Sequence, residues 1–325
     1  MNIFDGHSDI WTDLIIKTEE GESDILRKYH LDKLRKGQIT GSIFAIWIDP
    51  PYWETPYKRT IQVLEAIKKE MEYCKDLVLL AKSYSDIEKA SKENKFCIFT
   101  GLEGLSSIGE NLDILDFYYN CGARHAGLTW NEENALATGV KGNPGRGLTN
   151  LGKRAVKKIN DKNMLLDVSH LNDKSFWDVI GTTDRPVIAS HSNCRKLCDN
   201  PRNLTDQQLK ALAGTNGLVG LNSYKEFVHQ DIDKQNVKML AKHAVHMADI
   251  MGVDHIGLGM DYLDFLDKKS TDSFSSQEIS YTGGLEDASK TGNLIIELGN
   301  EGFTKDEIEK ITHGNFYRVI KEVIK

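Results

Sequence analysis

Apolar runs alternate with amphipathic helical patterns along the whole chain of 325 residues. In residues 57–76, for example, Ile61, Leu64, Ile67 and Met71 recur at three- and four-residue steps and share one face of a helix. The same spacing predicts helices over 111–121, 149–163, 172–180 (with Asn172 as its N-cap), 205–213 and 235–251. Eight short apolar runs predict strands, at residues 2–5, 41–48, 96–101, 123–129, 164–168, 186–190, 217–222 and 255–260.

This alternation of strands and helices is typical of a parallel sheet whose strands are joined by crossover helices. Because the eight strand candidates are almost continuously apolar, we expect an α/β fold that closes into a (β/α)8 TIM-type barrel. An open doubly wound sheet is less favoured, since neither the G-x-G-x-x-G motif nor the P-loop motif occurs. Residues 1–325 are expected to form a single domain.

A polar, serine-rich stretch at about 264–286 follows the last strand candidate and is expected to form a long loop over the barrel mouth. Two helices, at about 287–299 and 304–324, are then expected to close the chain. Thr304 is the predicted N-cap of the second helix, with Glu307 at the position that completes a capping box.

Titratable side chains follow the carboxyl ends of five strand candidates. The first such end carries His7 and Asp9, which point the same way because strand side chains alternate in direction. The others are Glu103, His170, His191 and Asp261, after the third, fifth, sixth and eighth candidates. In a barrel these ends surround one mouth, where such enzymes place their active sites. Imidazole and carboxylate groups together are suitable ligands for Zn²⁺ or a similar divalent ion.

The number of converging ligands is too high for a single zinc ion and suits two. We expect Glu103 to bridge both ions. His7 and Asp9 would complete the first set of ligands. His170 and His191 would complete the second set. A water that bridges two zinc ions has its pKa lowered toward about 7, so hydroxide forms near neutral pH.

Asp261 is the carboxylate that neither set of ligands needs. It would hold the bridging hydroxide and pass its proton to a leaving group, which makes Asp261 and Glu103 the predicted catalytic residues. This arrangement suits hydrolysis of an amide or an ester. His243 and His246, one helical turn apart, could also hold a metal ion, but a surface position or a satisfied buried one is favoured. The remaining histidines, treated as structural, are His30, His125, His229, His255 and His313.

Composition narrows the choice of partners and compartment. The 48 acidic residues exceed the 41 basic ones, for a net charge of −7, and this argues against nucleic acid as a partner. The five cysteines are irregularly spaced, as is typical of reduced thiols in a cytosolic protein. With neither a secretory signal nor an apolar run long enough to span a bilayer, we expect a cytoplasmic protein without a membrane partner.

Together, the motifs at the strand ends resemble those of the membrane (renal) dipeptidase family, which are zinc metallopeptidases of the amidohydrolase-like barrel type. The matching segments are Asp5–Asp9, Gly101–Gly104, Asp167–His170, Ser190–Asn193, Pro201–Asn203, Gly257–Asp261, Gly284–Asp287 and Gly314–Phe316. The resemblance implies two zinc ions per chain, hydrolysis of dipeptides that often carry a D-residue at the C-terminal position, and a homodimer. It also implies that Arg202 binds the substrate carboxylate with its bidentate guanidinium and that Tyr224 assists.

Two stretches depart from the family pattern, and one of them is Met260–Asp264, where the family usually has Asp-Phe-Asp-Gly. The family often has Leu-Thr-His-Asn after the fourth strand, with a histidine that contacts the substrate, and here Trp130 takes that place in Leu128–Asn131. An indole N–H donates one hydrogen bond but is neither a cation nor a metal ligand, so the preferred substrate is open to change. Two other interpretations therefore stay open: a hydrolase of this fold acting on a non-peptide amide, lactam or lactone, and a non-catalytic metal-binding barrel.

Overall fold

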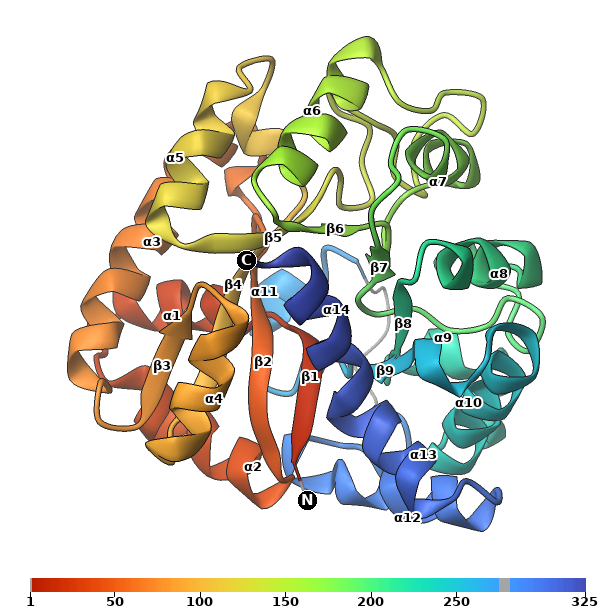
Figure 1. Ribbon diagram of the computed structural model, residues 1–325. Helices are drawn as coiled ribbons and strands as arrows, with labels where there is room; N and C mark the ends of the chain where they lie inside the picture. The colour runs from red at the N-terminus through yellow and green to blue at the C-terminus, as the bar shows by residue number, and fades with distance from the viewer. Residues whose placement is uncertain (1, 275–280) are drawn as a thin grey trace.

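A closed ring of eight parallel strands lies at the centre of the computed structural model, which describes residues 2–274 and 281–325 (Figure 1). The ring consists of β1 (Ile3–Ser8), β2 (Ile39–Ile46), β4 (Phe96–Glu103), β5 (Ala123–Gly127), β6 (Leu165–Asp167), β7 (Val187–Ala189), β8 (Leu218–Leu221) and β9 (Ile256–Leu258). The ring closes where β1 pairs with β9 and β2 pairs with β4. The predicted (β/α)8 barrel is confirmed, and each predicted strand overlaps one strand of the ring.

A further strand, β3 (Val78–Ala81), lies outside the ring and was not predicted. It pairs with the first half of β4, from Val78 opposite Phe96 to Ala81 opposite Phe99, whereas β5 pairs with the second half. The apolar run that forms β3 is only four residues long and lies between two helices. Hydrophobicity alone does not distinguish such a run from the end of a helix.

Helices surround the ring and connect its strands (Figure 1). They are α1 (Ile10–Glu19), α2 (Leu31–Lys36), α3 (Pro56–Tyr73), α4 (Tyr84–Lys92), α5 (Asp113–Cys121), α6 (Asn150–Asp161), α7 (Asp173–Ile180), α8 (Asp206–Gly214), α9 (Lys225–Val228), α10 (Val237–Met251), α11 (Lys268–Thr271), α12 (Gly292–Asn300), α13 (Lys305–Glu309) and α14 (Asn315–Val323). The helices predicted between strands are present as α3, α5, α6, α7, α8 and α10, whereas α1, α2, α4 and the short α9 and α11 were not predicted. Asn172 caps α7 as predicted, because its side chain accepts a hydrogen bond from the backbone N–H of Ser175.

The last helices close the amino end of the barrel. Thr304 and Glu307 form the predicted capping box at the start of α13, and a π-helical turn at Lys310–Gly314 separates α13 from α14. Helix α14 lies across the barrel in front of β1 (Figure 1), and the ring of its Phe316 lies 5.3 Å from that of Phe4. Apolar side chains from α14 and the strand beginnings fill this end, which leaves the carboxyl end for polar groups.

The stretch at 264–286 contains α11 and brings Phe274 to the carboxyl end of the barrel. Residues 275–280 of this stretch lie outside the described residues.

Two features of the described chain bear on its surroundings. No helix within 2–274 or 281–325 combines the length and apolar character that crossing a bilayer requires. All five cysteines fall within these ranges, and none of them forms a disulfide.

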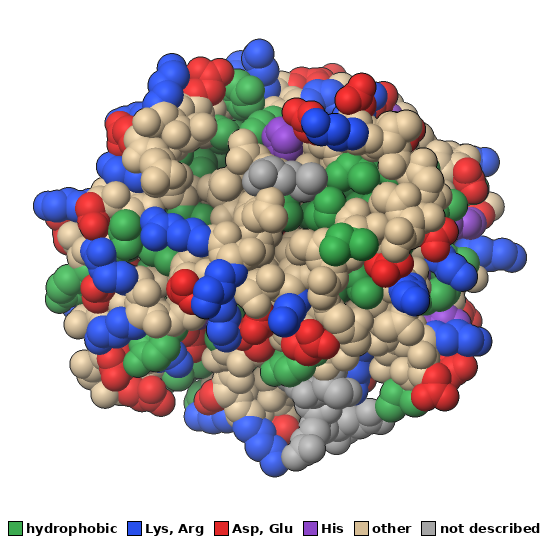
Figure 2. Space-filling view, turned by 90° about the horizontal axis from the view of Figure 1, so that it is seen from below, with side chains coloured by type: hydrophobic (Ala, Val, Ile, Leu, Met, Phe, Trp, Pro, Cys, Tyr) green, Lys and Arg blue, Asp and Glu red, His purple; other side chains and the backbone are tan. Residues whose placement is uncertain are grey.

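Figure 2 shows acidic and basic side chains interspersed over the face seen from below.

Candidate metal centre

The carboxyl ends of all eight ring strands line one cavity of about 270 Å³. In strand order, the lining residues at these ends are Asp9, Trp47, Glu103, Trp130, His170, His191, Tyr224 and Asp261. Five of these residues are histidines or carboxylates, and the buried His7 lies beside them. The predicted convergence of distant polar residues on one mouth therefore occurs in the structure.

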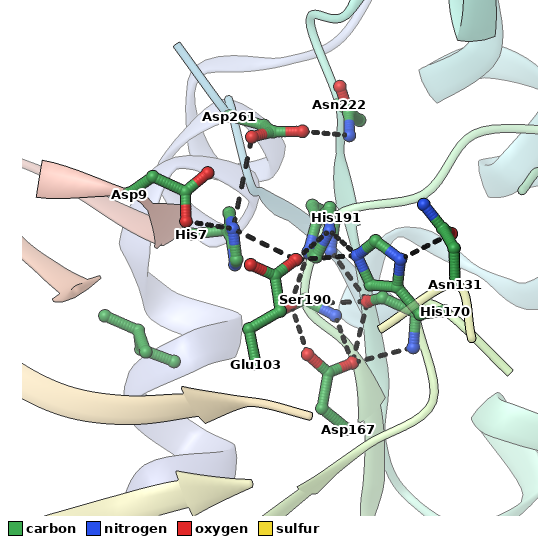
Figure 3. Close-up of polar contacts among 12 residues, drawn as sticks. His7, Asp9, Glu103, Asn131, Asp167, His170, Ser190, His191, Asn222 and Asp261 are labelled. Carbon is green, nitrogen blue, oxygen red and sulfur yellow. Dashed lines mark hydrogen bonds and ion pairs between the residues drawn. The ribbon is translucent and has the colours of Figure 1, made fainter. Parts of the chain in front are cut away.

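Glu103 lies at the centre of the titratable group (Figure 3). Its Oε1 is 2.6 Å from Nε2 of His170 and 3.5 Å from Nε2 of His191. The same oxygen is 3.6 Å from Nε2 of His7, on the other side of the group. One carboxylate oxygen thus lies within 3.6 Å of an imidazole nitrogen from each of the two predicted sets of ligands.

Asp9 and Asp261 approach the ring of His7 from β1 and β9. Nε2 of His7 is 3.7 Å from Oδ1 of Asp9 and 4.0 Å from Oδ1 of Asp261. The other oxygen of Asp261 accepts a hydrogen bond of 3.0 Å from the side-chain amide of Asn222. Asp261 has a φ of 56°, in the left-handed region that non-glycine residues rarely adopt. Such backbone strain is common at functional sites.

Hydrogen bonds behind the two imidazoles fix their tautomers. Nδ1 of His170 lies 3.0 Å from Oδ1 of Asn131, which can only accept, so that nitrogen carries the proton. Ser190 donates its hydroxyl proton to Asp167 at 2.5 Å and accepts from Nδ1 of His191 at 2.7 Å. Both Nε2 atoms are therefore left without a proton and face each other at 2.9 Å, and Nη2 of Arg202 lies 3.3 Å from Nε2 of His170. Two facing lone pairs repel each other unless a cation lies between or beside them.

Burial and mutual repulsion perturb the ionisation of the group. Burial raises the pKa of Glu103 and of Asp261, and the neighbouring carboxylate of Asp9 raises both further. Burial opposes charge on His7, but Glu103, Asp9 and Asp261 outweigh it and raise the pKa of His7 to about 10. Burial, together with Arg202 and His7, lowers the pKa of His170.

The donor set suits divalent cations. Both ring nitrogens of His7 and Oδ1 of Asp9 are buried without a hydrogen-bond partner in the described structure. Two geometric groups could each hold an ion, one formed by His7, Glu103 and His191 and the other by His7, Asp9 and Asp261. Buried carboxylates that lack hydrogen-bond donors are costly unless cations neutralise them.

The family model for membrane dipeptidases (peptidase family M19) matches residues 1–325. The chain belongs to this family. An uncharacterized protein from the pqqA 5′ region of Klebsiella pneumoniae is 32% identical over 81% of this chain and 95% of its own length. Dipeptidase aclJ of Aspergillus oryzae is 27% identical over 98% of this chain and 77% of its own length.

Solved structures share the dipeptidase barrel. A metallo peptidase from Rhodobacter sphaeroides, liganded with a phosphinate mimic of the dipeptide L-Ala-D-Ala, matches with a TM-score of 0.88 at 23% identity and 99% coverage of both chains. The structure of dipeptidase AC, a metallo peptidase of family M19, also matches with a TM-score of 0.88, at 24% identity over 100% of this chain and 99% of its own. At these identities the matches establish the fold.

Arg202 lies in the wall of the cavity and is only 5% exposed. Its guanidinium donates to the backbone oxygen of Ser169, and Nη2 lies 3.4 Å from the backbone oxygen of His191 and 3.3 Å from Nε2 of His170. Its buried Nε has no hydrogen-bond partner among the described residues. Burial lowers the pKa of Arg202 to about 10, so the group remains a cation at neutral pH.

Several residues of this membrane dipeptidase family site have no signal in the sequence. His125, which was treated as structural, lies 2.8 Å from Asp167 and so supports the network behind His191. Trp47 and Phe274 line the cavity, but an aromatic residue after an apolar run looks like core. Asn222, the partner of Asp261, directly follows β8, and Asn131, the partner of His170, lies in the loop after β5. Position after a strand is the signal that could have found Asn222.

The two histidines of α10 have separate structural roles. Nδ1 of His243 accepts a hydrogen bond from the backbone N–H of Cys194, and its Nε2 lies 2.8 Å from the backbone oxygen of Val228. His246 lies 2.8 Å from a carboxylate oxygen of Asp206. The favoured interpretation, satisfied histidines rather than a second metal site, agrees with these contacts.

Proposed function

We propose that this protein is a dipeptidase that works with two zinc ions. Membership of a metallopeptidase family supports metal-dependent hydrolysis of dipeptides. The observation that carries the two-ion assignment is the position of Glu103 Oε1, within 3.6 Å of Nε2 atoms on both sides of the site. The proposed ligands are His7, Asp9 and Glu103 for one ion, and Glu103, His170 and His191 for the other.

When bound, the two ions supply Lewis-acid chemistry and lower the pKa of a water that they share, so that hydroxide is available near neutral pH. Asp261 turns Oδ1 toward the ligands while Asn222 holds Oδ2. From this position Asp261 can accept a proton from the attacking water and return it to the leaving amine.

Arg202 is the proposed partner of the substrate carboxylate. It is a buried cation in the cavity wall, and its Nε has no hydrogen-bond partner among the described residues. Tyr224 and Trp130 line the same cavity and are proposed to contact the substrate. We extend the proposal to dipeptides with a D-residue at the C-terminal position, because a metallo peptidase of the same fold was solved with a mimic of L-Ala-D-Ala.

The test combines metal analysis with a dipeptide panel. The purified protein is stripped with a chelator, reloaded with zinc, analysed for bound zinc per chain, and assayed with L,L-, L,D- and D,L-dipeptides. We expect two zinc ions per chain and hydrolysis that chelation abolishes. Glu103→Gln should lose zinc and activity together, whereas Glu132→Gln, at a partly buried glutamate just beyond β5, should retain both. Fewer than one zinc ion per chain would refute the assignment and favour a non-catalytic barrel.

Trp130 supports a second candidate, a hydrolase of this fold that acts on a non-peptide amide, lactam or lactone. Its indole offers one donor and no positive charge where the family often has a histidine. The same panel decides between the two. Two bound zinc ions without turnover of any dipeptide would favour this second candidate.

A further inference from the structure

A series of aromatic contacts runs around the mouth of the cavity. The ring of Trp130 lies 6.3 Å from that of Trp53 and 5.3 Å from that of Trp47. Trp47 continues the series to Phe274, whose ring centroid is 6.0 Å away. These four residues come from segments that follow β2, β5 and β9, so only the closed barrel brings them together.

The series continues on the other side of Phe274. The rings of Phe274 and Tyr224 lie 6.4 Å apart, and those of Tyr224 and Phe227 lie 4.9 Å apart. The guanidinium carbon of Arg202 lies 5.2 Å from the ring of Phe227. We call the six residues the aromatic arc: Trp53, Trp130, Trp47, Phe274, Tyr224 and Phe227.

The part of the arc that follows β2 is firmly held. Nε1 of Trp53 donates to the backbone oxygen of Ile48 at 2.8 Å. Asp49, two residues after Trp47, accepts two hydrogen bonds of 2.8 Å from the guanidinium of Arg59. Arg59 is fully buried, so this bidentate pair is shielded from water. A surface fixed in this way can select a ligand at a low entropic cost.

The arc leaves distinct surfaces for the two residues of a dipeptide. If Arg202 takes the substrate carboxylate, the adjacent rings of Tyr224 and Phe227 adjoin the C-terminal residue. Trp47 and Trp130 both contact Phe274 on the side of the arc away from Phe227, and the ring of Trp130 lies 6.2 Å from that of His170, so these two rings are left for the side chain of the N-terminal residue. Binding against these flat rings is most favourable for a large apolar side chain, because the favourable free energy of burial grows with the apolar area removed from water.

We propose that the aromatic arc selects dipeptides whose N-terminal residue has a bulky apolar side chain. The inference rests on the proposed function, since it concerns the substrate of the same site. A single buried methylene can change kcat/KM by about 10- to 200-fold in a fitted pocket. Leu-Ala and Phe-Ala should therefore exceed Gly-Ala by at least about tenfold in kcat/KM.

The experiment measures kcat/KM for two series of dipeptides with the zinc-loaded protein. In the X-Ala series the N-terminal residue is Gly, Ala, Leu or Phe, and in the Ala-X series the same residues occupy the C-terminal position. Trp130→Ala should lower kcat/KM for Phe-Ala and Leu-Ala more than for Ala-Ala, so that the three values converge. Trp130 is only half-buried, and Trp53→Ala, at the exposed outer end of the arc, provides a second variant that opens no core.

Trp177→Ala serves as a matched control, because Trp177 is an exposed tryptophan on α7 that does not line the cavity. It should leave the ranking of the X-Ala series unchanged. Equal kcat/KM across the X-Ala series would overturn the inference, and so would a preference that survives both Trp130→Ala and Trp53→Ala. Failure to hydrolyse any dipeptide with zinc bound is a different result, which overturns the proposed function itself.

Discussion

The hydroxyl of Ser190 is expected to control how tightly zinc binds at the His170 and His191 end of the site. It donates to Asp167 at 2.5 Å and accepts from Nδ1 of His191 at 2.7 Å. These contacts keep the proton of His191 on Nδ1 and the lone pair of Nε2 directed at Glu103. Ser190→Ala removes this acceptor, so the proton can move to Nε2 and block the ligand position.

The expected loss of zinc affinity follows from the buried polar group that Ser190→Ala leaves unpaired. Nδ1 of His191 becomes a buried donor without an acceptor, which costs about 1–3 kcal/mol. Partners of this kind behind a metal ligand change metal affinity by about 10- to 100-fold when they are removed. We therefore expect one of the two zinc ions to bind about 10- to 100-fold more weakly in Ser190→Ala, and the other to change less.

Competition with a chromophoric chelator measures both zinc affinities without relying on catalysis. Ser192→Ala is the matched control, because Ser192 is also fully buried and its hydroxyl has no hydrogen-bond partner in the described structure. The control should keep both affinities within about twofold, since no partner is lost. Equal affinities in the two variants would refute the role assigned to Ser190.

Three further predictions concern stability and positioning. Burial lowers the pKa of His243 from 6.5 to about 4. As the pH falls from 6.5 to 4, His243 becomes protonated in the unfolded chain before it does in the folded protein, so up to about 3 kcal/mol of the free energy of unfolding is lost. Urea unfolding at pH 7 and pH 4.5 should show a smaller loss in His243→Gln. A Cβ at Gly259 would overlap a backbone oxygen, whereas one at Gly299 meets nothing within 4 Å, so Gly259→Ala should lower Tm and Gly299→Ala should not. Asp49→Asn should weaken its pair with Arg59 and raise KM for apolar dipeptides more than it lowers kcat, as steady-state kinetics can show.

The sequence predicts the barrel and the chemistry at its mouth for a common reason. Apolar strands and the polar residues that directly follow them are local features, and the barrel geometry alone brings the strand ends together. His7, Glu103 and His191 could therefore be placed near one another from their positions after strands. The prediction required no knowledge of side-chain contacts.

The residues that sequence patterns missed depend on contacts between distant segments. His125 finds its partner in Asp167, 42 positions along the chain, and nothing near His125 indicates this pairing. Trp47 and Phe274 look like core residues until the segments that follow β2 and β9 are brought to the same mouth of the barrel. The shape of the cavity, and with it the preferred substrate, is therefore a tertiary property that local patterns do not contain.

The backbone segments around Ser190 are packed too closely for side chains at three glycines. A Cβ added at Gly6, Gly220 or Gly259 would lie within 3.0 Å of the backbone oxygen of Ser190, closer than real Cβ atoms come. Only glycine at these positions lets the backbone approach Ser190 so closely. The backbone N–H of Ser190 donates to Asp167, and its hydroxyl accepts from His191. One residue therefore couples the spacing of the strands that lead to His7 and Asp261 to the orientation of the His191 imidazole. A rigid barrel end of this kind holds the proposed ligands in place in advance, which would favour tight binding of the two proposed ions.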